Sequence, residues 1–435
     1  DIGKEISVNS HLNSVMFNDD FNKQYEKTLP LISNYYSDLG ANKELYQAFI
    51  RVKDTKLNEQ QKHIVKESLR SFELSGVALD GAKSSRFKEI KEQLSLLSNQ
   101  FSKNVLQATN SWKKVVSENA LKGFSESELS KVRAGDNYEI NLQVPIYIDL
   151  MTYADNRELR EEVYKAYISR ASDVGITSKE FDNRKIMDEI LELRSELSQL
   201  VGFSNYAQYS VESKMVDSPE AVIDFLEKLI ELSLPQARSE LNELQSFAGH
   251  ELMPWDLMYY SEKLKQKKFN FKSSDLKPYF PEESVFNGLF NTIQKLYGIE
   301  LNIIDEVTYH SDVRVIELTD SDGHIGRIYL DVYARENKRG GAWMSDYQGL
   351  YKDSLPVAFV VCNLNSPSQG KPALFDFDEI VTIFHEFGHA LHHLLTKVPF
   401  PCAAGINGVP WDGVELPSQY MENFCYERGV INQMS

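Results

Sequence analysis

Apolar residues recur at helical spacing through most of the first 260 residues of the chain. One stripe has an apolar residue every three or four positions: Ile90, Leu94, Leu97, Phe101 and Val105. A second stripe runs from Ile186 to Leu200, and Gly202 provides a stop signal directly after it. Such spacing places the apolar side chains on one face of a helix. This part of the chain is therefore predicted to be mainly helical.

A third helix is expected to begin at Pro219. Ser218 before it is a favoured N-cap residue, and proline is tolerated at the first helical position. We expect its apolar face to be buried: Val222, Phe225, Leu226 and Leu229. All three stripes predict a packed core and carry no catalytic meaning.

The pattern changes to strands after about residue 310. Two β-rich runs, Val313–Thr319 and Ile325–Tyr333, are joined by Asp320–Gly323 and predict a hairpin. A third strand is expected at Val357–Cys362. An edge strand of such a sheet could pair with an extended peptide. A sheet that only packs behind the next helix fits equally well.

Residues 376–395 predict a well-marked helix. Asp376 can cap it, and Glu379 lies three residues later, as in a capping box. The expected buried side consists of apolar residues at helical spacing: Ile380, Phe384, Phe387 and Leu391. The residues on the other faces of this helix carry the candidate chemistry.

His385-Glu386-Phe387-Gly388-His389 lies inside this helix and has the layout of a zinc-peptidase motif. His385 and His389 are one turn apart on the same face, so both can bind one metal ion. Glu386 can reach a water bound to that metal and act as general base. Gly388 has no side chain, which would allow a neighbouring element to approach closely.

A catalytic zinc site needs a third protein ligand. The extended metzincin pattern is excluded, because its glycine and third-histidine positions hold His392 and Leu395. The other common solution takes a glutamate from a following helix. Glu415 is well placed for this role, since a loop rich in proline and glycine, 399–413, reverses the chain before it.

Other residues near the motif receive weaker roles. Glu422 lies on the same helical face as Glu415 and could orient a ligand histidine, whereas a solvent-exposed glutamate is the simpler alternative. Glu427 is given little weight. His392 and His393 are left over, and His392 is expected to be packed or hydrogen-bonded because it lies too far along the helix.

The chain has 47 basic and 64 acidic residues, a net charge of −17, and no basic stripe. Nucleic acid and membranes are therefore not expected as partners. The longest apolar run, Pro356–Cys362, is too short to span a bilayer, and the polar N-terminus offers no hydrophobic signal region. Three distant cysteines, Cys362, Cys402 and Cys425, form no disulfide framework, which fits a reducing cytoplasm.

Segments throughout the chain resemble the thimet oligopeptidase, neurolysin and oligopeptidase A family of zinc metallopeptidases, and its bacterial oligopeptidase A branch most. They are Ser10–Val15, Phe72–Gly76, Pro254–Asp256, Tyr329–Trp343, and Val409–Asp412 through Glu422–Asn423. The resemblance implies one zinc ion per chain, with His385, His389 and Glu415 as ligands and Glu386 as base.

The resemblance also implies a fold and a substrate class. The expected fold is mainly α: a two-domain, channel-containing zincin-type (gluzincin) metallopeptidase with a small β-sheet next to the active-site helix. Residues 1–150 would form an N-terminal helical region and residues 151–435 the catalytic region. The channel would admit short unfolded peptides, whose internal bonds a zinc-dependent oligopeptidase cleaves inside the cell.

Family members extend beyond both ends of this chain. The resemblance therefore implies a truncated chain, with the residues that contact substrate and tetrahedral intermediate beyond Ser435 and a missing C-terminal region needed for activity. Two alternatives remain open. One is a dipeptidyl carboxypeptidase of the same family, and the other is a truncated, non-catalytic, zinc-containing peptide-binding module.

Overall fold

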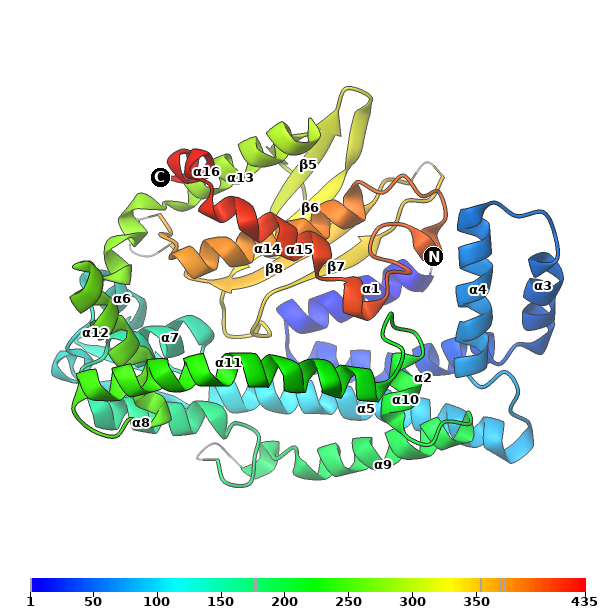
Figure 1. Ribbon diagram of the computed structural model, residues 1–435, viewed down its shortest axis with the longest axis horizontal. Coiled ribbons are helices and arrows are strands. Elements are labelled where there is room, and N and C mark those ends of the chain that lie inside the picture. The colour runs from blue at the N-terminus through cyan, green and yellow to red at the C-terminus, as the bar shows by residue number, and fades with distance from the viewer. Residues whose placement is uncertain (1, 176–178, 353, 368–369, 371) are drawn as a thin grey trace.

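The computed structural model describes residues 2–175, 179–352, 354–367, 370 and 372–435. Helices dominate, as predicted, and a five-stranded sheet lies in the C-terminal half (Figure 1). No helix in the described part of the chain combines the length and apolarity needed to span a bilayer. The first helices are α1 (Ile2–Val15), α2 (Asp19–Gly40), α3 (Lys43–Lys53), α4 (Glu59–Leu74) and α5 (Gly81–Ser111).

A small antiparallel sheet, of strand order β1-β3-β2, follows α5 and was not predicted from the sequence. The elements of this region are β1 (Lys113–Val116), α6 (Glu126–Val132), β2 (Arg133–Ala134), β3 (Asn137–Asn141), α7 (Val144–Tyr153) and α8 (Arg157–Ile168). The helices after it are α9 (Arg184–Leu200), α10 (Tyr206–Val211), α11 (Pro219–Ala248), α12 (Leu257–Phe269) and α13 (Glu282–Tyr297).

The first two predicted stripes form α5 and α9, and they pack against each other. Ile90 of α5 belongs to the same core cluster as Leu193 and Leu197 of α9. Gly202, just after α9, has a φ of 94°, a left-handed conformation that glycine adopts without strain. The two helices and the stop signal are therefore confirmed.

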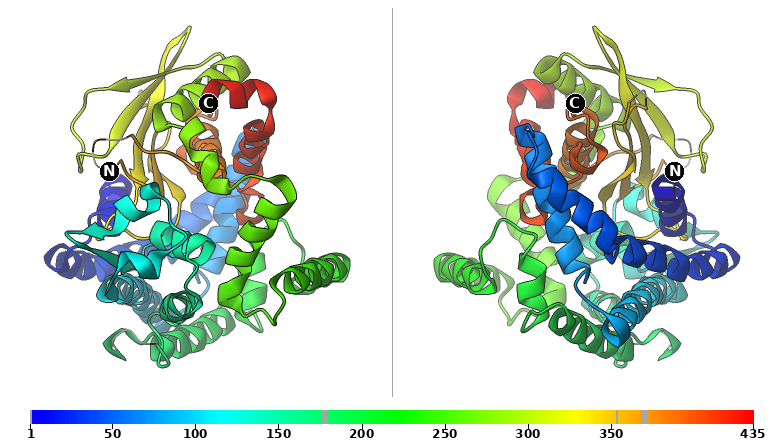
Figure 2. Two further views of the ribbon diagram at one scale, coloured as in Figure 1. Left: turned by 90° about the vertical axis from the view of Figure 1, so that its left-hand side faces the viewer. Right: turned by 90° about the vertical axis from the view of Figure 1, so that its right-hand side faces the viewer.

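The third predicted helix, α11, begins where expected, with the Ser218 side chain as its N-cap. Its apolar face, however, is not buried. Phe225, Leu226 and Leu229 are 62%, 49% and 45% exposed, and Val222 is only partly buried. Figure 2 shows α11 standing apart at one side of the molecule, and its main contacts are with α10 and α12. The prediction was wrong because residue spacing identifies a shared face but does not supply the element that covers it.

The large sheet has the strand order β4-β5-β6-β8-β7. Its strands are β4 (Glu300–Ile304), β5 (Arg314–Asp320), β6 (Gly323–Tyr333), β7 (Trp343–Gln348) and β8 (Val357–Leu364). The predicted hairpin is confirmed as β5 and β6, and the third predicted strand as β8, which runs parallel to β6. The two edge strands, β4 and β7, were not predicted from the sequence.

Helix α14 (Phe377–Leu394) packs against this sheet through its predicted side (Figure 1). Its apolar residues are at most 3% exposed and share one core with α13, β6 and β8: Ile380, Phe384, Phe387 and Leu391. The capping box is present, since Asp376 and Glu379 each accept a hydrogen bond of 2.9 Å from the other's backbone N–H. Two short helices follow, α15 (Leu416–Glu422) and α16 (Arg428–Met434).

A buried lysine links the start of α14 to the small-sheet region. The Lys277 ammonium lies 3.8 Å from carboxylate oxygens of Glu128 and Asp149, and 4.0 Å from the capping residue Asp376. Burial lowers the pKa of Lys277, but the three carboxylates outweigh this effect and hold the pKa above its usual value. Lys277 is therefore a buried cation shared by three acidic side chains.

We predict that Lys277→Met destabilises the protein by about 3–5 kcal/mol, because it leaves buried carboxylates without their shared cation. Urea denaturation followed by circular dichroism measures the free energy of unfolding. Lys23→Met is the matched control, since Lys23 forms an exposed pair with Asp20 whose loss should have little effect. Equal stability of the two variants would contradict this prediction.

Candidate metal centre

Helix α14 presents His385 and His389 on the same face. The two imidazole rings are 5.0 Å apart between centroids and nearly perpendicular. His389 is buried, and this burial lowers its pKa. A neutral imidazole is the form that binds a metal, so the environment of His389 favours the metal-binding form.

Glu415 reaches the same face from the start of α15. Its Oε2 atom lies 3.1 Å from His385 Nε2 and 3.1 Å from His389 Nε2. Burial raises the pKa of Glu415, but the hydrogen bond from Ser418 and the two histidines hold it below its usual value. The carboxylate is therefore ionised when it faces the two imidazoles.

The structure thus brings together the three residues that the sequence singled out as a ligand set. One ligand atom from each of His385, His389 and Glu415 lies within 4.8 Å of the other two, and no other such group occurs among the described residues. Two imidazole nitrogens and one carboxylate oxygen are the donor set of open catalytic zinc sites. The donor set fits a zinc ion, whose tetrahedral coordination would leave a fourth position for a non-protein ligand.

The approach of α15 to α14 depends on Gly388. A Cβ atom at this position would lie 2.5 Å from the Pro417 carbonyl oxygen and 2.5 Å from Ser418 Cα. No residue with a side chain could occupy the position without moving the backbone of α15. The predicted close approach at Gly388 is confirmed.

Two side chains fix the orientation of the candidate ligands. Glu422 Oε1 lies 2.6 Å from His385 Nδ1, which leaves His385 Nε2 facing Glu415. The Ser418 hydroxyl donates to Glu415 Oε2 at 2.8 Å. Glu422 is therefore not the solvent-exposed glutamate of the simpler alternative. Ser418 was missed, although it follows Glu415 by three residues, the spacing at which a helical hydroxyl can reach back.

Glu386 lies beside the ligand set and is 4% exposed. Its Oε2 atom is buried and has no hydrogen-bond partner among the described residues. Burial raises the pKa of Glu386 to about 7, the nearby His385 opposes this effect, and Glu415 adds to it. A buried, unpartnered carboxyl group with a pKa near neutrality can exchange a proton at ordinary pH.

The remaining candidates lie outside the cluster. His393 is fully buried and its Nε2 atom is 3.0 Å from the Gln348 carbonyl oxygen in β7, so it ties α14 to the sheet. His392 is partly buried and does not join the ligand group. Glu427 is exposed at the start of α16.

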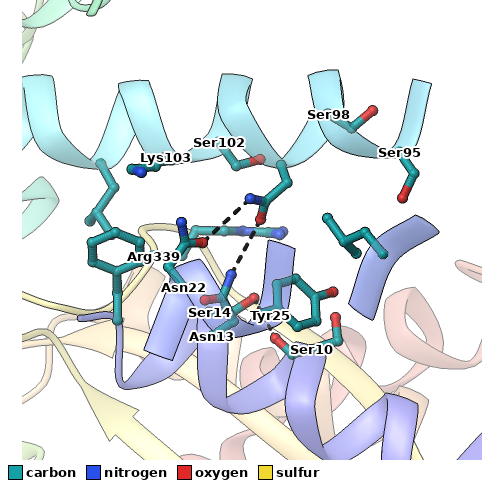
Figure 3. Close-up of a pocket in the computed structure, with 14 residues that line it drawn as sticks. Ser10, Asn13, Ser14, Asn22, Tyr25, Ser95, Ser98, Ser102, Lys103 and Arg339 are labelled. Carbon is teal, nitrogen blue, oxygen red and sulfur yellow. Dashed lines mark hydrogen bonds between the residues drawn. The ribbon is translucent and has the colours of Figure 1, made fainter. Parts of the chain in front are cut away.

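A separate polar cavity of about 290 Å³ lies between α1, α2 and α5 (Figure 3). Its amide side chains bond to one another, with Asn99 linked to Asn13 and Asn22 at 3.3 Å each. The two cationic lining residues are Lys103 and Arg339, and the lining contains no histidine, cysteine or carboxylate. It therefore offers no second metal site.

Comparison with known proteins finds similarity to peptidases. Residues 150–435 match Peptidase family M3, and residues 3–84 match the Neurolysin/Thimet oligopeptidase N-terminal domain. Oligopeptidase A of Escherichia coli (strain K12) is 47% identical over 98% of this chain. Organellar oligopeptidase A, chloroplastic/mitochondrial, of Arabidopsis thaliana is 37% identical over 97%, and dipeptidyl carboxypeptidase of Escherichia coli (strain K12) is 31% identical over 94%.

The aligned parts make up 66%, 57% and 62% of these three relatives, so this chain spans two thirds of their length or less. The family match covers well over half of this chain and includes α14 and α15. The candidate metal centre therefore sits within the matched region, and the chain belongs to peptidase family M3.

Proposed function

We propose that this chain carries the catalytic metal centre of a zinc-dependent oligopeptidase that hydrolyses internal bonds of short, unfolded peptides. Residues 1–150 would be its N-terminal helical region and residues 151–435 its catalytic region. The observation that carries the proposal is the convergence of His385, His389 and Glu415 beside a buried carboxyl group. The hydrolysis is proposed for an enzyme as long as its relatives, of which this chain spans about two thirds or less.

In the proposed mechanism, His385, His389 and Glu415 hold the metal, and Glu422 and Ser418 keep His385 and Glu415 in orientation. The chemistry that zinc supplies in such a site is Lewis-acid polarisation of the scissile carbonyl and acidification of a water toward a pKa of about 7. Glu386 accepts the proton of the attacking water at its carboxylate and delivers it to the leaving amine.

The substrate class is supported by two observations. The relatives of higher identity are named oligopeptidases, at 47% and 46% identity, whereas a dipeptidyl carboxypeptidase is 31% identical. In addition, β7 is one of the two edge strands of the five-stranded sheet, and it contacts α14. An edge strand can pair with an extended peptide. Product mapping separates the two activities, because a dipeptidyl carboxypeptidase releases successive C-terminal dipeptides.

We also propose a cytoplasmic location. All three cysteines are free thiols, and Cys402 is exposed. A reducing compartment protects an exposed thiol from oxidation. Relatives of this chain are named both as cytosolic and as organellar oligopeptidases.

We predict that Glu386→Gln abolishes proton transfer while the metal stays bound, because glutamine cannot accept the water proton. Turnover of a quenched fluorescent peptide should fall by at least about a hundredfold, the typical contribution of a general base. The measurement compares the variant with the unmodified enzyme at equal zinc content. Normal turnover by a zinc-loaded variant would remove Glu386 from the mechanism. A separate result would favour the non-catalytic binding module. In that case an unmodified protein of full family length would bind the peptide but not cleave it.

For Glu415→Ala, we predict loss of zinc, because only two protein ligands would remain. Zinc content after dialysis against metal-free buffer, measured by atomic emission, should fall from about one ion per chain to a small fraction. Glu427→Ala is the matched control, since Glu427 is an exposed glutamate away from the cluster. Undiminished zinc in Glu415→Ala would place the third ligand elsewhere.

A third prediction concerns the zinc-free protein. Its Glu386 has a pKa raised from 4.5 to about 7, so the folded state binds a proton more tightly than the unfolded state does. The stabilisation is complete below pH about 4.5 and is lost as pH rises through about 7, a change of roughly 3 kcal/mol. Urea denaturation should show the unmodified protein losing about this much stability relative to Glu386→Gln over this pH range, because the other titrating groups are common to both proteins. Parallel pH profiles would contradict the assigned pKa.

A further inference from the structure

Asp412 joins the turn before Glu415 to a segment almost two hundred residues earlier in the sequence. It lies in the turn Trp411–Gly413, three residues before Glu415. Its carboxylate oxygens each accept a hydrogen bond of 3.0 Å from the Met215 backbone N–H, and Oδ2 accepts another of 3.0 Å from the Val216 N–H. Met215 and Val216 belong to the connection between α10 and α11.

These contacts fix the course of the backbone rather than the position of one flexible side chain. A carboxylate that accepts from backbone N–H groups forms charge-assisted hydrogen bonds, which are stronger than neutral ones. Accordingly, the bonds from Met215 and Val216 lower the pKa of Asp412. Gly413 also lies close to the Met215 side chain: a Cβ added to Gly413 would be 3.2 Å from the sulfur atom of Met215.

One neighbouring side chain, that of Val414, is buried directly before Glu415, whereas Trp411 is 75% exposed and Leu416 is 77% exposed. After Glu415, the backbone is fixed by the packing of Pro417 and Ser418 on Gly388. Within residues 409–414, the described hydrogen bonds to a distant part of the chain are those that Asp412 accepts.

We propose that Asp412 is a positioning residue that holds Glu415 in place for metal binding. It does so by tying the turn before Glu415 to the Met215–Val216 backbone, while the contact of α15 with Gly388 fixes the other side. The inference rests on the proposed function, because it takes Glu415 as a metal ligand. If Asp412 served only the connection between α10 and α11, its removal would leave the metal affinity unchanged.

The test is a double-mutant cycle on zinc affinity in this chain, measured by competition with a zinc-binding indicator dye. Asp412→Ala should weaken zinc binding about tenfold or more, the typical effect of losing a residue that orients a ligand. In the Glu415→Ala background the same substitution should change the affinity by less than about twofold, because it acts through Glu415. Asp412→Asn keeps one acceptor oxygen and should lie between, and it replaces Asp412→Ala in the cycle if that variant does not fold.

Asp320→Ala is the matched control. Asp320 is an exposed aspartate that accepts a backbone hydrogen bond from Asp322 in the β5–β6 turn, and its loss should not affect zinc binding. Unchanged zinc affinity in Asp412→Ala would overturn the inference, as would an equal loss in the Glu415→Ala background. Either result would still be compatible with His385, His389 and Glu415 as the metal ligands. Normal zinc binding by Glu415→Ala alone, in contrast, would contradict that ligand set as well.

Discussion

The close packing of α15 on α14 is the constraint on which the candidate site depends. Glu415 belongs to a different element from the two histidines, and its carboxylate can meet both imidazoles only if the two helices nearly touch. Gly388 makes this possible, because any Cβ there would collide with the backbone at Pro417 and Ser418. Gly388 therefore contributes to the site by having no side chain, which lets α15 approach α14 closely.

The helix that carries the histidines is itself firmly held. Its apolar side is buried against the five-stranded sheet, and its first turn is closed by a capping box. The capping residue Asp376 also belongs to a buried charge cluster around Lys277, which connects α14 to the small-sheet region. His393 adds a hydrogen bond to β7 near the other end. The two histidines therefore lie on a helix that is held at its start, along its buried side and near its end.

How much of this could be predicted from the sequence depends on whether the information is local. The motif helix, its cap and the β5–β6 hairpin follow from residue spacing, and all were predicted. Glu415 was singled out because a loop rich in proline and glycine reverses the chain before it. The failures involve distant parts of the chain. The spacing of the α11 stripe could not show that its apolar face lies open, and the roles of Asp412 and Ser418 arise from contacts that exist only after folding.

The central claim is that His385, His389 and Glu415 bind one zinc ion. Crystals of the zinc-loaded protein, measured on both sides of the zinc absorption edge, test it most directly. We expect one anomalous difference peak per chain, within bonding distance of Nε2 of both histidines and of the Glu415 carboxylate. A peak bound by other residues, or none between α14 and α15, would contradict the account.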